Sequence, residues 1–170
     1  EYEEGIKATY FVNPHSDFYN IAEKSQTEII EEILSLGHFL GLHLDCKFYE
    51  TSNHEIGLSN IESIVSNEAN YIESICVSRP VAFSFHNPSL ADLKNESNSY
   101  GGLVNCYSKW FKEEASYCSD SNGYWRFNRL FDVLSEEPSS CLQVLTHPGW
   151  WHEHPFSPRT RIFKIIYERA

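Results

Sequence analysis

The chain has 170 residues, which is enough to bury a substantial core and predicts one domain over residues 1–170. Its hydrophobic fraction of 41% and charged fraction of 22% are ordinary for a globular protein and exclude wholesale disorder. With 13 basic and 24 acidic residues the formal net charge is −11, so a nucleic-acid partner is not expected. No apolar run has the length that a membrane span needs.

Cysteine usage predicts the compartment. The five cysteines are widely spaced and form no Cys-x-x-Cys pair, which argues against a disulfide scaffold and against a thiolate zinc site. We therefore predict a reducing, cytoplasmic location. The sequence contains no methionine and opens on Glu1, so we expect the natural chain to have a beginning that precedes this residue.

Hydrophobic patterning predicts strands that alternate with helices, starting near the N-terminus. A β-branched and aromatic run predicts a buried strand over 7–12. Residues 25–28 have the pattern of a capping box, in which Ser25 opens a helix that ends at Gly37. A second strand is expected over 39–44.

The same helix and strand pattern then recurs. A second capping box at 59–62 opens a helix, a third strand is expected over 81–85, and the polar, glycine-containing segment 95–102 is expected to be a surface loop. The remaining predicted elements are a strand over 102–105, a helix over 108–115, a strand over 117–119, a helix over 127–134, a strand over 142–146 and a closing helix that begins at Ser157-Pro158.

This alternation predicts right-handed βαβ crossovers and a parallel sheet. With about six strands and no dinucleotide-binding fingerprint, we expect a closed or partly open β/α barrel. Such folds bind ligands at the carboxyl ends of their strands. The polar side chains expected at those ends are Asn13, His15, His43, Asp45, His86, Asn87, Asn105, Asp120 and His147.

Imidazole and carboxylate groups at one rim favour a metal site. A single histidine after a strand is more often structural, but several that converge point to ligands for zinc, nickel, cobalt or iron, with zinc as the first choice. His43 and Asp45 share one face of an extended segment, and His86 would approach from the neighbouring strand. A bound divalent ion lowers the pKa of its water and polarises a carbonyl, which suits amide or ester hydrolysis. His147 is the candidate general acid for a leaving amine.

Two tryptophans follow His147 directly. Trp150 and Trp151 come after Pro148-Gly149, in the last βα loop. They are either core anchors of that loop or a flat platform against which a sugar ring stacks, and both interpretations stay open.

Several segments resemble the polysaccharide deacetylase family, the NodB-homology carbohydrate esterases. They are 5–12 (GIKATYFV), 36–43 (LGHFLGLH) and 145–151 (LTHPGWW), and they carry a Gly-His-x-x-Gly-x-His motif and a final Leu-x-His. Segments 83–89 (FSFHNPS) and 117–121 (YCSDS) are similar to a divergent, WbmS-like branch found with surface-polysaccharide genes. The resemblance covers essentially the whole chain in the right order.

The resemblance implies a distorted β/α barrel that removes N-acetyl groups from a sugar in a metal-dependent reaction. The family's first motif, with its two aspartates, would lie on a strand before Gly5 and is absent from this chain, so the barrel is expected to lack its first strand here. The second metal histidine of the family would fall at Lys47, so His86 or Asp45 is expected to replace it.

The resemblance also implies roles for residues in the second half of the chain. Asp120 matches the aspartate that tunes the catalytic pair, and His147 matches the catalytic acid. Trp125 and Arg126 lie near Asp120 and, with Trp150, are expected to bind the substrate.

We therefore expect a metal-dependent deacetylase that acts on an N-acetylated sugar or surface-polysaccharide precursor, with carbohydrate as its partner. The alternative is a catalytically degenerate barrel that keeps the pocket and the tryptophans and binds carbohydrate without turnover. A cyclic amidohydrolase of another β/α type is a third possibility, and it would bind a second metal ion and show no dependence on a sugar.

Overall fold

The computed structural model describes residues 1–49, 60–125, 128–136, 141–151, 153–154 and 156–168. The chain forms two compact units, residues 1–110 and residues 111–170. The expectation of one domain over the whole chain stays a prediction.

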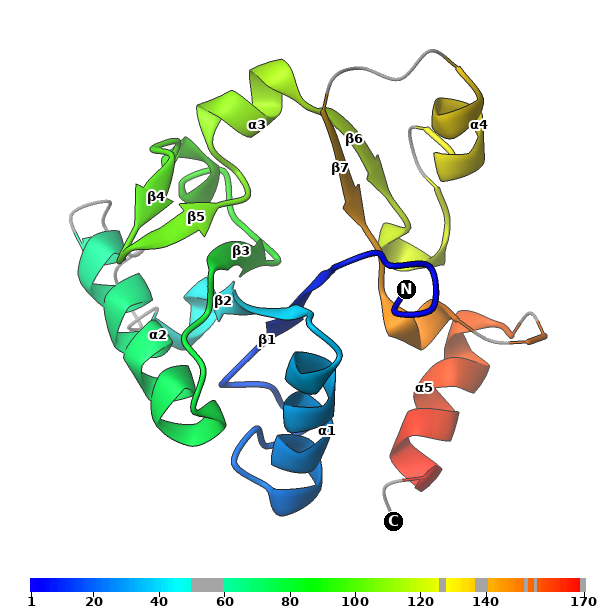
Figure 1. The fold of residues 1–170 in the computed structure, drawn as a ribbon, viewed down its shortest axis with the longest axis horizontal. Helices are drawn as coiled ribbons and strands as arrows, with labels where there is room; N and C mark the ends of the chain where they lie inside the picture. The colour runs from blue at the N-terminus through cyan, green and yellow to red at the C-terminus, as the bar shows by residue number, and fades with distance from the viewer. Residues whose placement is uncertain (50–59, 126–127, 137–140, 152, 155, 169–170) are drawn as a thin grey trace. The chain divides into compact units, whose positions relative to one another are not determined.

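The first unit is built on a sheet of five strands (Figure 1). The strands are β1 (Thr9–Val12), β2 (Phe39–Asp45), β3 (Ala82–His86), β4 (Ser99–Tyr100) and β5 (Leu103–Asn105). Their order is β1-β2-β3-β5-β4, in which only β4 is antiparallel to its neighbour. A mixed α/β fold with a largely parallel sheet is thus confirmed.

The expected closed or partly open β/α barrel is not seen across the described ranges. Within the described residues no sheet closes, because β1 forms one edge of the five-stranded sheet and β4 forms the other. The antiparallel β4 pairs with β5 through a tight connection and ends the parallel series at that edge.

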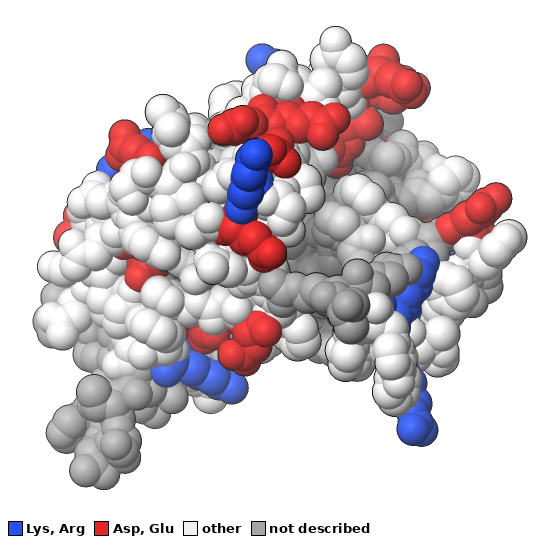
Figure 2. Space-filling model, turned by 90° about the horizontal axis from the view of Figure 1, so that it is seen from below, with Lys and Arg blue, Asp and Glu red and all other residues white. Residues whose placement is uncertain are grey.

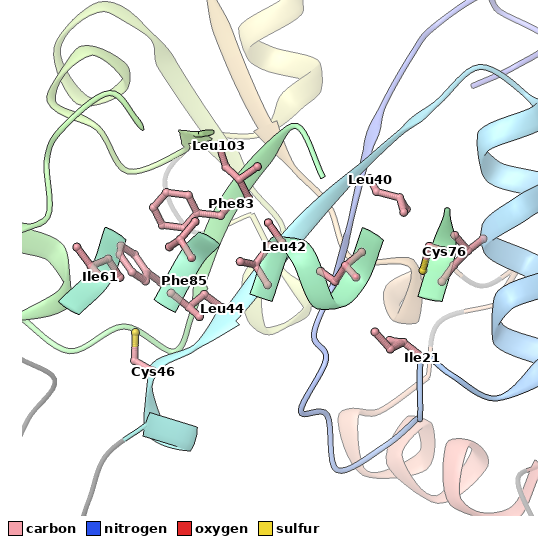
Figure 3. Packing of buried hydrophobic residues seen from close by; sticks show 14 residues of the cluster. Ile21, Leu40, Leu42, Leu44, Cys46, Ile61, Cys76, Phe83, Phe85 and Leu103 are labelled. Atoms are coloured by element: carbon pink, nitrogen blue, oxygen red, sulfur yellow. The ribbon is translucent and has the colours of Figure 1, made fainter. Parts of the chain in front are cut away.

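The core of the first unit lies between one face of this sheet and two helices, α1 (Lys24–Ser35) and α2 (Ile61–Cys76). Figure 3 shows how the apolar side chains of β2 and β3 meet those of α2. Because strand side chains alternate between faces, this packing leaves the remaining residues of β2 and β3 on the opposite face. The buried members from the sheet and α2 are Leu40, Leu42, Leu44, Phe83, Phe85, Leu103, Ile61, Val65, Ala69, Ile72 and Cys76.

The start of α1 differs from the prediction. The helix begins at Lys24 with Glu23 in extended conformation as the N-cap, and no side-chain capping bond is formed. Ser25 therefore lies inside the first turn, where it cannot act as the cap. The predicted end is confirmed, since Gly37 has a φ of +84° after the last helical turn. Ser59 of the second predicted capping box lies outside the described residues.

Segment 95–102 lies largely at the surface, as its composition suggested, with residues 96–99 and 102 exposed, but part of it is a strand. It contains β4, and the buried Asn105 side chain donates hydrogen bonds to the carbonyl oxygens of Asn95 at 2.8 Å and Ser97 at 2.9 Å. The Asn105 backbone N–H also donates to the Asn98 oxygen at 2.9 Å. One asparagine thus satisfies the polar backbone that the composition alone would leave to water.

The second unit contains two parallel strands, β6 (Ser116–Ser119) and β7 (Leu142–Leu145), which pair with each other. Helix α3 (Lys109–Glu114) spans the division between the units. Two further helices are α4 (Leu130–Ser135) and α5 (Pro158–Glu168). Helix α4 begins later than expected, and Phe127 of the predicted helix lies outside the described residues.

Helix α5 begins as predicted, with a proline in its first turn. The Ser157 hydroxyl oxygen accepts a hydrogen bond from the Thr160 N–H at 3.2 Å and so caps this helix. In the part of the chain that the structure describes, no helix combines the length and the apolar character needed to cross a membrane. Figure 2 shows one face of the molecule, on which acidic side chains form several groups and basic ones are scattered.

Candidate functional site

The register of β2 and β3 brings two predicted ligands together. His43 lies opposite Ser84, and Asp45 lies opposite His86. All four residues are half-buried and alternate with the core residues of their strands, so they occupy the sheet face that the helices leave open. The expectation that His43 and Asp45 share a face, with His86 on the adjacent strand, is confirmed.

The side chains of Ser84, His43, His86 and Asn87 form a continuous hydrogen-bonded row. His43 Nδ1 lies 2.8 Å from Ser84 Oγ, and His43 Nε2 lies 3.1 Å from His86 Nδ1. The two imidazole rings meet edge to face, with centroids 4.9 Å apart and an interplanar angle of 73°. His86 Nε2 in turn lies 3.2 Å from the side-chain amide nitrogen of Asn87, which follows β3 directly.

The geometry of the histidine pair fits two ligands of one metal ion. Two nitrogens bound to a tetrahedral zinc ion at about 2.0–2.1 Å lie about 3.3 Å apart, close to the separation of His43 Nε2 and His86 Nδ1. The other ring nitrogen of His43 lies 2.8 Å from Ser84 Oγ, which can accept its proton in the arrangement that orients metal-bound imidazoles. If the Asn87 amide is turned by 180°, its oxygen accepts from His86 in the same way.

Asp45 takes a different role. Its Oδ1 atom accepts a hydrogen bond from the Lys47 N–H at 3.1 Å, which fixes the turn after β2. Among the described residues, no group of three or more histidine, cysteine, aspartate or glutamate side chains is arranged to hold a metal ion. The histidine pair therefore offers two protein ligands, and the assignment of Asp45 as a third stays a prediction.

The second unit contains a carboxylate and imidazole pair. Asp120 directly follows β6, and His147 lies two residues beyond the end of β7. Asp120 Oδ1 is 2.6 Å from His147 Nδ1, and Asp120 Oδ2 accepts the His147 backbone N–H at 3.1 Å. The His147 side chain is 42% exposed, whereas that of Asp120 is 10% exposed. A buried carboxylate thus fixes the ring and leaves Nε2 for other partners.

Trp150, predicted to be either a core anchor or part of a sugar platform, lies against a cation. The Arg161 guanidinium carbon lies 4.6 Å from the centroid of a Trp150 ring. Gly123 lies against the same indole, since an added Cβ there would be 3.2 Å from Trp150. Trp151 is half exposed and Trp125 is half-buried. Arg126, the other predicted substrate residue, lies outside the described residues.

Another predicted rim histidine belongs to a separate group. His15 Nε2 contacts Glu68 Oε1 at 2.9 Å, and the Tyr49 hydroxyl donates to the same oxygen. The His15 ring stacks on Phe48 with centroids 3.5 Å apart. Glu68 belongs to α2 and is 5% exposed. Its contacts with His15 and Tyr49 therefore join the turns after β1 and β2 to this helix. Asn13, also expected at the rim, accepts the His15 N–H through its side-chain oxygen at 2.9 Å.

Sequence reasoning missed Ser84, Glu68 and Arg161. Ser84 lies two residues before His86 on one strand, so alternation would have placed it on the histidine face. No local signal marks Glu68 or Arg161, because both lie in amphipathic helices among other charged residues.

Comparison of the chain with protein-family models, with curated proteins and with solved structures finds no match. The resemblance to polysaccharide deacetylases stays a prediction.

Proposed function

We propose that this protein is a metal-dependent deacetylase of an N-acetylated sugar or surface-polysaccharide precursor. The observation that carries the proposal is the facing pair of imidazole nitrogens, His43 Nε2 and His86 Nδ1, at 3.1 Å. His43 and His86 would hold the ion, zinc being the first choice because neutral imidazole suits it. A divalent ion bound there would lower the pKa of water and polarise the acetamido carbonyl.

The residues around the pair would keep it ready for the ion. Ser84 Oγ fixes the rotation of the His43 ring, and the Asn87 side chain does the same for His86. Asp45, at the end of the same strand as His43, is the proposed additional ligand; to bind, its carboxylate would have to share or give up its hydrogen bond with Lys47.

His147 is the proposed general acid. Deacetylation breaks the amide C–N bond, and the leaving amine needs a proton when the acetyl group departs as acetate. Asp120 accepts the Nδ1 proton of His147 and so directs Nε2 outward, where it would donate the proton to the leaving amine. Asp120 is in this assignment a positioning residue.

The strand order supports a barrel-type fold for this activity. In β1-β2-β3-β5, each parallel strand is added on the same side of the preceding one. Right-handed crossovers then place the connecting helices on one face, as in β/α barrels, whereas doubly wound sheets reverse direction and have helices on both faces. The histidine pair lies on the face opposite the helices, which in the proposed barrel-type fold would face the interior.

Metal content and acetate release test the proposal together. We expect the purified protein, after incubation with zinc, nickel or cobalt and dialysis, to retain about one ion per chain and to release acetate from N-acetylglucosamine oligosaccharides. His43→Ala and His86→Ala should lose the ion, whereas His147→Ala should keep it and lose acetate release. His154→Ala, which removes an exposed histidine, is the matched control and should change neither quantity.

Two results would overturn these assignments. Failure of the wild-type protein to retain any of these ions at micromolar concentration would reject the enzyme and favour the binding-only alternative. Equal loss of metal in His147→Ala and His43→Ala would reject the separate roles of these two histidines.

A further inference from the structure

Arg161 is a half-buried cation in the second unit, and two of its donor atoms have no hydrogen-bond partner among the described residues. It lies in the first turn of α5, where its backbone N–H donates to the Ser157 oxygen at 3.1 Å. Its side chain extends over Trp150 at 4.6 Å. The Nε and Nη1 atoms are buried, and neither has a hydrogen-bond partner among the residues that the structure describes.

Burying these N–H donors without partners costs free energy unless a bound ligand supplies a hydrogen-bond acceptor. A guanidinium group carries five N–H donors and no acceptor, and burying charged donors without partners costs more than burying neutral ones. The indole face attracts the cation through its ring quadrupole. The acceptor that matches a guanidinium best is an anionic oxygen of a carboxylate or a phosphate.

Arg161 belongs to the same group of contacts as the His147 and Asp120 pair. The Trp150 backbone N–H donates to the His147 carbonyl oxygen at 2.9 Å. The Gly123 N–H donates to the Asp120 carbonyl oxygen at 2.9 Å, and Gly123 lies against the Trp150 indole. A ligand held by Arg161 would therefore lie beside the loop that carries the proposed acid.

We propose that Arg161 and Trp150 form a subsite for an anionic group on the sugar, so that the preferred substrate is an acidic saccharide. This proposal rests on the proposed deacetylase function and names its substrate class. The anionic group is a carboxylate, as in a uronic acid, or a phosphate ester. The formal net charge of −11 provides no long-range attraction for such a ligand, so recognition depends on direct contact with the guanidinium.

Binding measurements with matched sugars test the subsite. Isothermal titration with glucose, glucuronate and glucose 6-phosphate separates a neutral ligand from the two anionic ones. We expect at least one anionic sugar to bind about tenfold or more tightly than glucose to the wild-type protein, and Arg161→Gln to remove this preference. The anionic sugar that binds more tightly shows whether the subsite recognises a carboxylate or a phosphate ester.

Arg159→Gln is the matched control, because Arg159 lies on the same helix and its guanidinium is over the Phe163 ring at 5.5 Å. It should leave the preference for the anionic sugar unchanged. If Arg161→Gln fails to fold, as judged by circular dichroism, Arg161→Lys keeps the charge but loses the planar donor set and should reduce the preference. The subsite is rejected by equal binding of neutral and anionic sugars to the wild type, by an unchanged preference in Arg161→Lys, or by equal losses in Arg159→Gln and Arg161→Gln.

Acetate release distinguishes failure of the subsite from failure of the deacetylase. Anion binding that depends on Arg161, without acetate release from any acetamido sugar, would refute the deacetylase and leave the subsite intact. Acetate release at equal rates from neutral and acidic acetamido sugars, unchanged in Arg161→Gln, would refute the subsite and leave the deacetylase intact.

Discussion

The proposed chemistry of this protein would depend on a few side chains whose surroundings set which proton or ligand each can take. His43 and His86 face each other through ring nitrogens, and each has a second partner on its other nitrogen. His147 is oriented instead by a carboxylate, Asp120, through Nδ1. The first arrangement suits metal binding and the second suits proton transfer, because a nitrogen that binds a metal cannot also carry a proton.

The thiols provide a contrast, since their surroundings suppress reactivity. Burial raises the pKa of the Cys106 thiol from 9.0 to about 11, because the thiolate would lose its hydration. Burial also raises the pKa of the Cys76 and Cys118 thiols. None of these three cysteines is therefore a candidate nucleophile at neutral pH.

We expect Cys106 to react with iodoacetamide at pH 8 about 100-fold more slowly in the folded protein than in urea, since the thiolate fraction falls with the raised pKa. The folded state holds this proton more tightly than the unfolded state, so the stability contribution is complete below pH 9 and is lost as the pH rises toward 11. Mass spectrometry of the alkylated peptide measures the rate. Equal rates in the folded and unfolded protein would contradict the assignment.

At the scale of elements, the contact between the β4–β5 hairpin and α2 decides how the parallel sheet ends. Gly101 has a φ of +56°, and an added Cβ there would lie 2.5 Å from the Ser66 backbone nitrogen. Gly102, with a φ of +78°, has no atom within 4 Å of an added Cβ. The hairpin thus needs glycine for conformation at both positions and for close approach only at the first.

We expect Gly101→Ala to lower the free energy of unfolding by about 2–4 kcal/mol, because backbone must move in addition to the strain of a positive φ. Gly102→Ala should cost only about 1 kcal/mol, from the positive φ alone. Urea denaturation of both variants measures the difference. Equal losses in the two variants would show that α2 does not lie against Gly101 in solution.

At the scale of the whole molecule, metal binding should couple to folding. The histidine pair joins β2 to β3 in the centre of the sheet of the first unit, so an ion bound there is bound only when the sheet is formed. The acidic formal charge of −11 also favours the uptake of a cation.

We expect zinc at 100 times its dissociation constant to stabilise the protein by about 2.7 kcal/mol, and to raise the midpoint of thermal unfolding by about 5–10 °C. A chelator should reverse the shift. His86→Ala should abolish it, whereas His154→Ala should not. Differential scanning calorimetry measures the midpoint, and an undiminished shift in His86→Ala would place the bound zinc elsewhere.

The sequence by itself determined the alternation of strands and helices, the face shared by His43 and Asp45, and the positions of Asp120 and His147 after their strands. These features follow from patterns with a period of two or of 3.6 residues and from strand ends, all of which depend on neighbours along the chain.

Only the tertiary structure decided the partner of each side chain. His43 pairs with Ser84 through the register of two strands, His15 pairs with Glu68 across 53 residues, and the open sheet ends in a hairpin held by Asn105. Register, helix packing and the satisfaction of buried polar groups join residues that are distant in the chain, so no local pattern contains them.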